Sequence, residues 1–165
     1  MVFSGLPGSG KTAIARPLAR TLGLTLLELD LIERPLLRRF AGDALGWAGY
    51  EILTVIADDN LALGTGVVLD CVTWTNAVRE QWRTLAGRHR ARFRPIEVVC
   101  ADRELLRARV EGRDGGGEVR KNAWPHVEAS FARYEPWATD RLALDATRPL
   151  DELVRAAVEY VKGGS

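Results

Sequence analysis

The most specific chemical motif of the chain lies near its start, where residues 5–12 read GLPGSGKT and fit the pattern G-x-x-x-x-G-K-[ST]. Glycines let the backbone curl so that its N–H groups face a polyphosphate, and a following helix adds the partial positive charge of its N-terminus. In such a loop Lys11 reaches the β- and γ-phosphates, and the Thr12 hydroxyl binds Mg²⁺. The motif therefore predicts binding of a nucleoside triphosphate, with ATP and GTP both open, together with Mg²⁺, through Gly8, Ser9, Gly10, Lys11, Thr12 and Ala13.

Two aspartates follow apolar runs and are candidates for catalysis and metal binding. Asp30 closes the run LTLLELD, and Asp70 closes the run VVLD. A carboxylate at Asp30 would face the γ-phosphate and could accept the proton of an acceptor hydroxyl. The alternative for Asp30 is a helix N-cap, since Glu33 follows at the spacing of a capping box. Asp70 could hold Mg²⁺ or its water shell, or it could bond to neighbouring backbone.

Arginines form a third candidate group. Arg109 and Arg113 lie four residues apart in a predicted helix and share one face, and Gly112 and residues 115–117 follow at once. This arrangement predicts a lid over residues 109–121 that brings positive charge onto the transferring phosphoryl group. A solvent-exposed helix face is the alternative, because arginine is by far the commonest basic residue of the chain.

Short apolar runs alternate with segments of helical periodicity along the whole chain. The predicted strands cover residues 1–4, 24–30, 67–72, 95–100 and 142–145. The predicted helices cover residues 12–22, 32–40, 47–63, 76–87, 103–111, 124–134 and 150–161. This alternation predicts one α/β domain over residues 1–165, with a five-stranded parallel sheet flanked by helices. Ligands of such sheets bind at the carboxyl ends of the strands, and helices over residues 31–64 are expected to bind the acceptor.

The composition is that of an ordinary globular protein. Hydrophobic residues make up 47% and charged residues 27%, and the net charge is +1, which disfavours a wholesale nucleic-acid coat. Cys71 and Cys100 lie far apart and end apolar runs, so buried, reduced thiols are expected. No stretch approaches the roughly 18 apolar residues of a membrane span, and the start carries no basic and apolar signal segment. We therefore expect a cytoplasmic protein with no membrane partner.

The chain resembles the P-loop kinases of the gluconate kinase, shikimate kinase, chloramphenicol phosphotransferase and polynucleotide 5′-kinase group, along nearly its whole length. The resemblance rests on the phosphate loop, Asp30, the run 67–70 with Arg79 nine residues later, the pair Arg109 and Arg113, the segment SFARYEP at 130–136 and DATRP at 145–149.

This resemblance implies a role for several single residues. Asp30 would bind and activate the acceptor hydroxyl. Arg109 would stack on adenine, and Arg113 would touch phosphates. Arg148, in a loop that borders the adenine, would lie against the ring, and Arg79 would contact the acceptor or a phosphate.

The acceptor is not specified by these motifs. The Gly-Gly-Gly turn of shikimate kinases is replaced by CVTW at residues 71–74, and the His-Phe pair of gluconate kinases is replaced by Asp-Gly at 114–115. Arg34 and Trp74 are the predicted acceptor contacts, because they flank the expected pocket and a Trp ring can stack on a flat group. Trp47 lies at helical spacing and is expected in the core, and the alternative is that its ring stacks on a flat acceptor.

The residues and the resemblance together predict a phosphotransferase that uses ATP and Mg²⁺ and moves the γ-phosphate to a hydroxyl of a small polar acceptor. Its catalytic residues would be Lys11, Asp30 and Arg113. One alternative is a polynucleotide 5′-hydroxyl kinase that binds single-stranded nucleic acid, suggested by basic residues at 34, 38 and 39. Another is a nucleotide-dependent binding module or switch with little transfer activity. No oligomeric state follows from the sequence.

Overall fold

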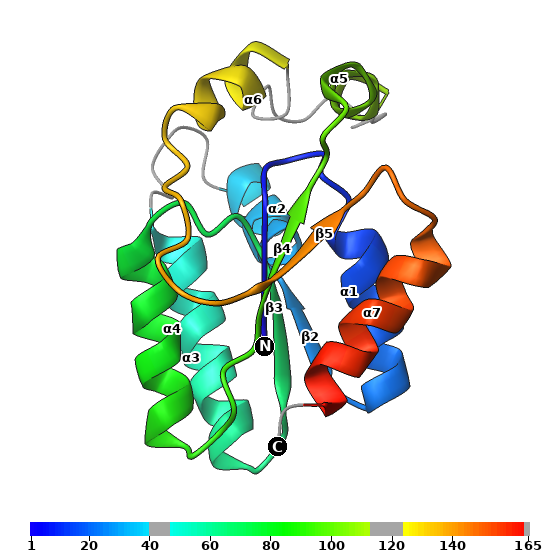
Figure 1. Cartoon of the computed structure of the whole chain (residues 1–165). Coiled ribbons are helices and arrows are strands. Elements are labelled where there is room, and N and C mark those ends of the chain that lie inside the picture. Colours follow the sequence, from blue (N-terminus) through cyan, green and yellow to red (C-terminus); the bar gives the residue numbers. More distant parts are fainter. Residues whose placement is uncertain (40–46, 113–123, 164–165) are drawn as a thin grey trace.

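A five-stranded, fully parallel sheet forms the centre of the computed structural model, which describes residues 1–39, 47–112 and 124–163 (Figure 1). The strands are β1 (Val2–Ser4), β2 (Thr25–Glu28), β3 (Val67–Asp70), β4 (Pro95–Val99) and β5 (Leu142–Asp145). Their order across the sheet is β2-β3-β1-β4-β5. The predicted fold class is therefore confirmed. Because β1 lies between β3 and β4, the loop that leaves β1 starts at the middle of the sheet.

Helices cover both faces of the sheet. They are α1 (Lys11–Leu22), α2 (Leu29–Arg39), α3 (Ala48–Ala62), α4 (Asn76–Arg88), α5 (Arg103–Glu111), α6 (Trp124–Phe131) and α7 (Leu150–Lys162). Figure 1 shows α1 and α7 side by side on one face, α3 and α4 on the other, and α5 and α6 beyond the carboxyl ends of the strands. Each face has its own apolar core, with Leu18 and Leu153 in one and Leu53 and Trp82 in the other. Burial on both faces explains why the strands are short apolar runs.

Several predicted boundaries differ from the structure by one to three residues, and two of them bear on the site. The second strand ends at Glu28 and α2 begins at Leu29, so Asp30 lies in the first turn of a helix and not at a strand end. An acidic side chain is favourable there because it faces the positive end of the helix dipole. Helix α6 ends at Phe131 and does not reach residue 134.

Several local signals of the sequence are confirmed. Asp102 caps α5, because its Oδ1 accepts a hydrogen bond from the Leu105 N–H at 2.9 Å. Gly23 ends α1 with left-handed backbone, at φ +64°. Cys71 is buried as expected, whereas Cys100 is only half-buried, and both are free thiols. Among the described helices, none is both long enough and apolar enough to cross a bilayer.

Candidate nucleotide and acceptor site

The phosphate loop joins β1 to α1 and is curled tightly against its neighbours. Gly5 and Gly8 have φ angles of +134° and +84°, which residues with a side chain rarely adopt. A Cβ on Gly5 would lie 2.1 Å from the carbonyl oxygen of Val98, and one on Gly8 would lie 2.6 Å from Cγ2 of Val110. Both positions therefore require glycine, because β4 and α5 press directly on the loop.

Two polar side chains of the loop are buried. Lys11 Nζ donates to the carbonyl oxygens of Gly5 at 2.9 Å and Leu6 at 3.1 Å, so the ammonium lies over the loop. The Ser9 side chain is 2% exposed, and its hydroxyl has no hydrogen-bond partner within the described residues. Buried hydroxyls are nearly always paired. A polyphosphate oxygen would satisfy Ser9, so the loop fits the ligand that its motif predicts.

Thr12 and Asp70 bring two oxygen ligands together beside the loop. Thr12 Oγ1 donates to Asp70 Oδ2 at 2.6 Å, which joins the start of α1 to the end of β3. Burial raises the pKa of Asp70 above its ordinary value, and the Lys11 ammonium and the Thr12 hydroxyl lower it in part. A hydroxyl and a carboxylate are the kind of ligand that Mg²⁺ takes. The pair therefore fits the predicted metal.

Glu28 is a residue of this region that sequence reasoning missed. It ends β2 and lies in register with Asp70 on the neighbouring strand. Its carboxylate accepts two hydrogen bonds from Arg16 of α1, from Nε and Nη2, each at 2.8 Å. The available signal was a charged residue inside an otherwise apolar strand, two positions before Asp30.

Asp30 lies at the same edge of the sheet as Asp70 and is exposed. Its negative charge contributes to the raised pKa of Asp70, Cys71 and Tyr50, after the larger effect of burial in each case. The carboxylates of Asp30 and Asp70 therefore share one electrostatic environment. The Asp30 carboxylate is therefore accessible from solvent at the edge of the sheet where the phosphate loop begins.

Aromatic rings line the region between α3 and the segment after β3. Tyr50 donates its hydroxyl to the Val72 carbonyl oxygen at 2.5 Å, and burial is the main cause of its raised pKa. Trp74 is half-buried and hydrogen-bonds to Tyr50. Trp47 packs edge-on against Tyr50 with 5.2 Å between ring centres, and it is 53% exposed. The prediction that Trp47 is a core residue is therefore wrong. It precedes α3 and covers only one side of the Tyr50 ring. Arg34 is exposed, one helical turn after Asp30.

Three arginines are predicted to contact the nucleotide, and their surroundings differ. Arg109 Nη2 donates to the Ala146 carbonyl oxygen at 3.0 Å, and its Nη1 lies 3.9 Å from where a Cβ of Gly10 would be. Arg109 is thus near both the phosphate loop and the loop after β5. Arg148 is exposed and pairs with Glu152 at 2.9 Å. Arg113 and most of the predicted lid, residues 113–121, lie outside the described residues.

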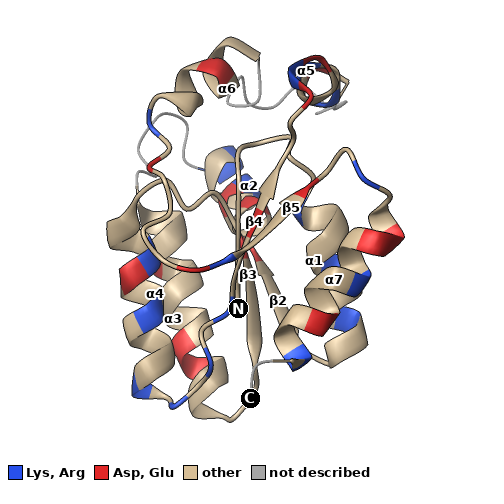
Figure 2. Ribbon diagram, viewed as in Figure 1, with Lys and Arg blue, Asp and Glu red and all other residues tan. Residues whose placement is uncertain are grey.

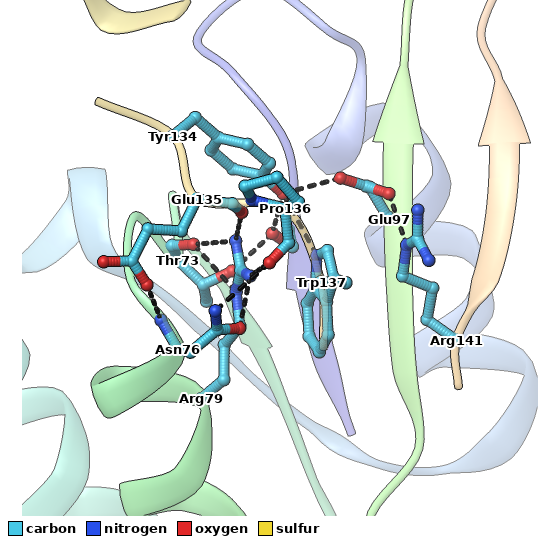
Figure 3. Close-up of polar contacts among 10 residues, drawn as sticks. Thr73, Asn76, Arg79, Glu97, Tyr134, Glu135, Pro136, Trp137 and Arg141 are labelled. Atoms are coloured by element: carbon cyan, nitrogen blue, oxygen red, sulfur yellow. Dashed lines mark hydrogen bonds and ion pairs between the residues drawn. The ribbon is translucent and has the colours of Figure 1, made fainter. Parts of the chain in front are cut away.

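Arg79 is 4% exposed, and all five of its N–H donors are used (Figure 3). Nε and Nη2 donate to the Thr73 carbonyl oxygen at 3.1 and 2.8 Å. Nη2 also donates to the Glu135 carbonyl oxygen at 2.7 Å, and Nη1 donates to Asn76 Oδ1 at 2.9 Å and the Pro136 carbonyl oxygen at 3.1 Å. Burial lowers the pKa of Arg79. This geometry favours an internal role over the predicted contact with acceptor or phosphate, because no donor remains for a substrate.

Comparison with known proteins adds the family context. A family model described as an AAA domain matches residues 1–136. A 50-residue segment is 47% identical to cytidylate kinase from Pyrobaculum aerophilum, and the match spans 30% of this chain and 27% of that kinase.

Two solved structures resemble the chain over almost its full length. A gluconokinase from Sinorhizobium meliloti 1021 has a TM-score of 0.68 at 20% identity, covering 97% of this chain and 89% of that one. An APS kinase from Mycobacterium tuberculosis, solved in complex with AMPPNP and APS, has a TM-score of 0.73 at 19% identity, covering 98% and 96%. At these identities the likeness shows a shared fold, which confirms the P-loop architecture predicted from the sequence.

Proposed function

Since the chain belongs to the AAA domain family, matched over residues 1–136, and has the fold of P-loop kinases, we propose that it is an ATP-dependent phosphotransferase that acts on a small hydroxylated acceptor. One observation carries the proposal. The phosphate loop, with the buried Lys11 and the Thr12–Asp70 hydrogen bond, lies at the same sheet edge as the exposed carboxylate of Asp30. A loop that holds phosphates and a carboxylate that accepts a proton are the two parts that phosphoryl transfer to an alcohol requires.

The chemistry follows from these positions. Lys11 and the loop N–H groups would hold the β- and γ-phosphates, and Thr12 and Asp70 would hold Mg²⁺, which neutralises charge on the phosphate oxygens when bound. The acceptor oxygen attacks the γ-phosphorus, its proton passes to the Asp30 carboxylate, and the bond to the bridging oxygen breaks to release ADP. Arg109, beside the loop, would contact the nucleotide, and Arg113 would stabilise the transferring phosphoryl group.

A small acceptor fits the described surface better than a polynucleotide does. Lys and Arg side chains are distributed over several helices and are interspersed with Asp and Glu (Figure 2). Binding of nucleic acid is favoured by basic residues gathered on one face. Arg34 and Trp74 would contact the acceptor. Arg34 lies one helical turn after Asp30 in α2, and Trp74 lies in the segment after β3. We therefore expect the acceptor to be a small polar molecule, such as a sugar acid, a nucleoside or a hydroxylated antibiotic, and not a nucleic-acid strand.

The test is a screen for ADP release with Mg²⁺-ATP and pooled sugars, sugar acids, nucleosides, hydroxylated antibiotics and a 5′-hydroxyl oligonucleotide. We expect one small-molecule pool to raise ADP release above the rate without acceptor. Asp30→Asn should lower the stimulated rate by about 10²-fold, the contribution of a general base. Lys11→Ala should abolish the stimulated rate.

Matched controls separate site chemistry from general damage to the protein. Asp140→Asn replaces an exposed aspartate before β5, and Lys162→Ala replaces the last residue of α7, and both should retain the parent rate. Stimulation by the oligonucleotide alone would support the polynucleotide kinase instead. ATP binding with no stimulated turnover by any pool would contradict the proposal and favour a nucleotide-dependent binding module.

A further inference from the structure

A short strap, residues 134–137, follows α6 and is bonded along its length to residues 73–76, the acceptor segment, which follows β3 (Figure 3). The Glu135 N–H donates to the Trp74 carbonyl oxygen at 2.9 Å. The Asn76 N–H donates to the Glu135 carboxylate at 2.6 Å, and Asn76 Nδ2 donates to the Pro136 carbonyl oxygen at 3.2 Å. The backbone of Trp74, a predicted acceptor contact, is therefore fixed by a part of the chain about 60 residues away.

Arg79 holds the strap and the acceptor segment together. Its donors reach the Thr73 carbonyl on one side and the Glu135 and Pro136 carbonyls on the other. Its guanidinium carbon also lies 4.3 Å from the ring centre of Trp137. A planar guanidinium with five donors can bridge several carbonyls at once, which a lysine ammonium cannot do in the same geometry. Buried carbonyls need partners, so the position specifically requires arginine.

A cluster of hydroxyls extends this unit to the phosphate loop. The Ser4 hydroxyl bonds to the Thr73 hydroxyl and, at 2.5 Å, to the Tyr134 hydroxyl. Tyr134 in turn donates to Glu97 of β4 at 3.0 Å. Ser4 directly precedes Gly5, the first residue of the loop. The acceptor segment, the strap and the start of the phosphate loop are thus one bonded unit.

We infer that Arg79 is a positioning residue for phosphoryl transfer, which fixes the acceptor segment and thereby sets where the acceptor lies relative to the phosphate loop. The inference rests on the proposed function, in which Trp74 contacts the acceptor. Arg79 itself touches no substrate, since its five donors are used inside the protein. Its effect on the reaction passes through Thr73 and Trp74, and small errors in such placement have large effects on rate.

The test compares Arg79→Lys with Arg83→Lys. Arg83 lies one turn later on α4, pairs with the exposed Glu80 and covers the Phe93 ring, so its variant is a matched control. A second variant, Glu135→Ala, removes the carboxylate that accepts the Asn76 N–H and leaves the buried guanidinium in place. It keeps the inference testable if Arg79→Lys does not fold. Each variant is measured below its melting temperature.

Two measured quantities decide the outcome: the acceptor concentration that gives half-maximal stimulation, and the Kd for Mg²⁺-AMPPNP. For Arg79→Lys we expect the half-saturating concentration of the stimulating acceptor pool to rise at least about tenfold, with the Kd for Mg²⁺-AMPPNP within about twofold of the parent value. In Glu135→Ala the half-saturating acceptor concentration should also rise, but by less. In Arg83→Lys neither this concentration nor the Kd should change. An equal loss of nucleotide affinity, or an unchanged acceptor requirement in folded Arg79→Lys, would overturn the inference.

A third readout does not depend on the acceptor. The fluorescence of Trp74, isolated by subtracting the spectrum of Trp74→Phe in the same background, is quenched with acrylamide. If no pool stimulates turnover, the proposed transfer fails and this measurement alone judges the positioning. Greater quenching of Trp74 in Arg79→Lys than in Arg83→Lys supports a displaced acceptor segment, and equal quenching overturns the inference.

Discussion

At the scale of single residues, Asp70 serves the site at a cost to the folded protein. Its carboxylate is 5% exposed, and burial raises its pKa. Below the ordinary pKa of 3.8 the group is protonated in both the folded and unfolded states and burial carries no charge penalty. As the pH rises through the folded-state pKa, the ionised form becomes costly in the folded state only. The free protein is therefore less stable at pH 7 than it would be with a neutral side chain here.

Asp70→Asn should raise the free energy of unfolding at pH 7 by on the order of 1 kcal/mol, because it removes a buried charge and keeps an oxygen that accepts from Thr12. The gain should shrink as the pH falls through the raised folded-state pKa toward the ordinary pKa of 3.8, below which the parent carboxyl is protonated in both states. Urea unfolding at several pH values measures the difference in free energy of unfolding between Asp70→Asn and the parent. Exposed Asp59→Asn is the control and should stay within about 0.5 kcal/mol of the parent. A loss of stability in Asp70→Asn at pH 7 would contradict the account.

At the scale of elements, α5 is positioned by direct contact with the phosphate loop. Gly8 leaves room for Val110 and Leu106, whose side chains lie where a Cβ of residue 8 would be. The Asp102 cap fixes the start of the helix, and Arg109 at its other end bonds to the loop after β5. Helix α5 and the phosphate loop are thus packed as one structure.

Gly8→Ala should lower the free energy of unfolding by roughly 1–3 kcal/mol, because it forces a residue with a side chain to a φ of +84° and places its Cβ 2.6 Å from Val110. It should also weaken nucleotide binding. Gly87→Ala in α4 is the opposite case, since its Cβ meets no atom within 4 Å, and it should gain about 0.5–1 kcal/mol from helix propensity. Chemical denaturation of both variants measures the two changes in the free energy of unfolding. Equal effects in the two would refute the packing argument.

At the scale of the whole molecule, nucleotide binding should raise the free energy of unfolding of the entire fold. The phosphate loop follows β1, the central strand, so the loop is formed only when the sheet is folded. At a Mg²⁺-AMPPNP concentration of about 100 times its Kd, the added stability is about 2.7 kcal/mol. For a chain of this length that corresponds to a rise in melting temperature of roughly 5–10 °C. Thermal unfolding with and without the nucleotide measures it.

The lysine variants test the origin of this shift. Lys11→Ala should lose most of it, because the ammonium that lies over the loop is removed. Lys162→Ala should keep the full shift, since that residue ends α7. An unchanged shift in Lys11→Ala would mean that the nucleotide binds elsewhere, and the same loss in both variants would mean that the loss reflects overall charge and not the phosphate loop.

The sequence predicts local and periodic features well and side-chain networks poorly. The phosphate loop, the five strands and the Asp102 cap follow from spacing and residue type. The internal bonding of Arg79 does not, because four of its five hydrogen bonds go to the backbone carbonyls of residues 73, 135 and 136, and no residue pattern encodes a carbonyl. The exposure of Trp47 was missed for a related reason. Helical spacing specifies a face of a helix, and packing at the helix end decides whether that face is covered.

The place of α2 and α3 in the topology has an evolutionary consequence. Both helices lie between β2 and β3, which are neighbours in the sheet and pair in register from Thr25 with Val67 to Glu28 with Asp70. The segment that contains α2 and α3 therefore connects two adjacent strands, whereas the phosphate loop follows another strand, β1. In the proposed function, substitutions in this segment, which carries Arg34, can therefore alter the choice of acceptor while the phosphate loop on β1 is kept.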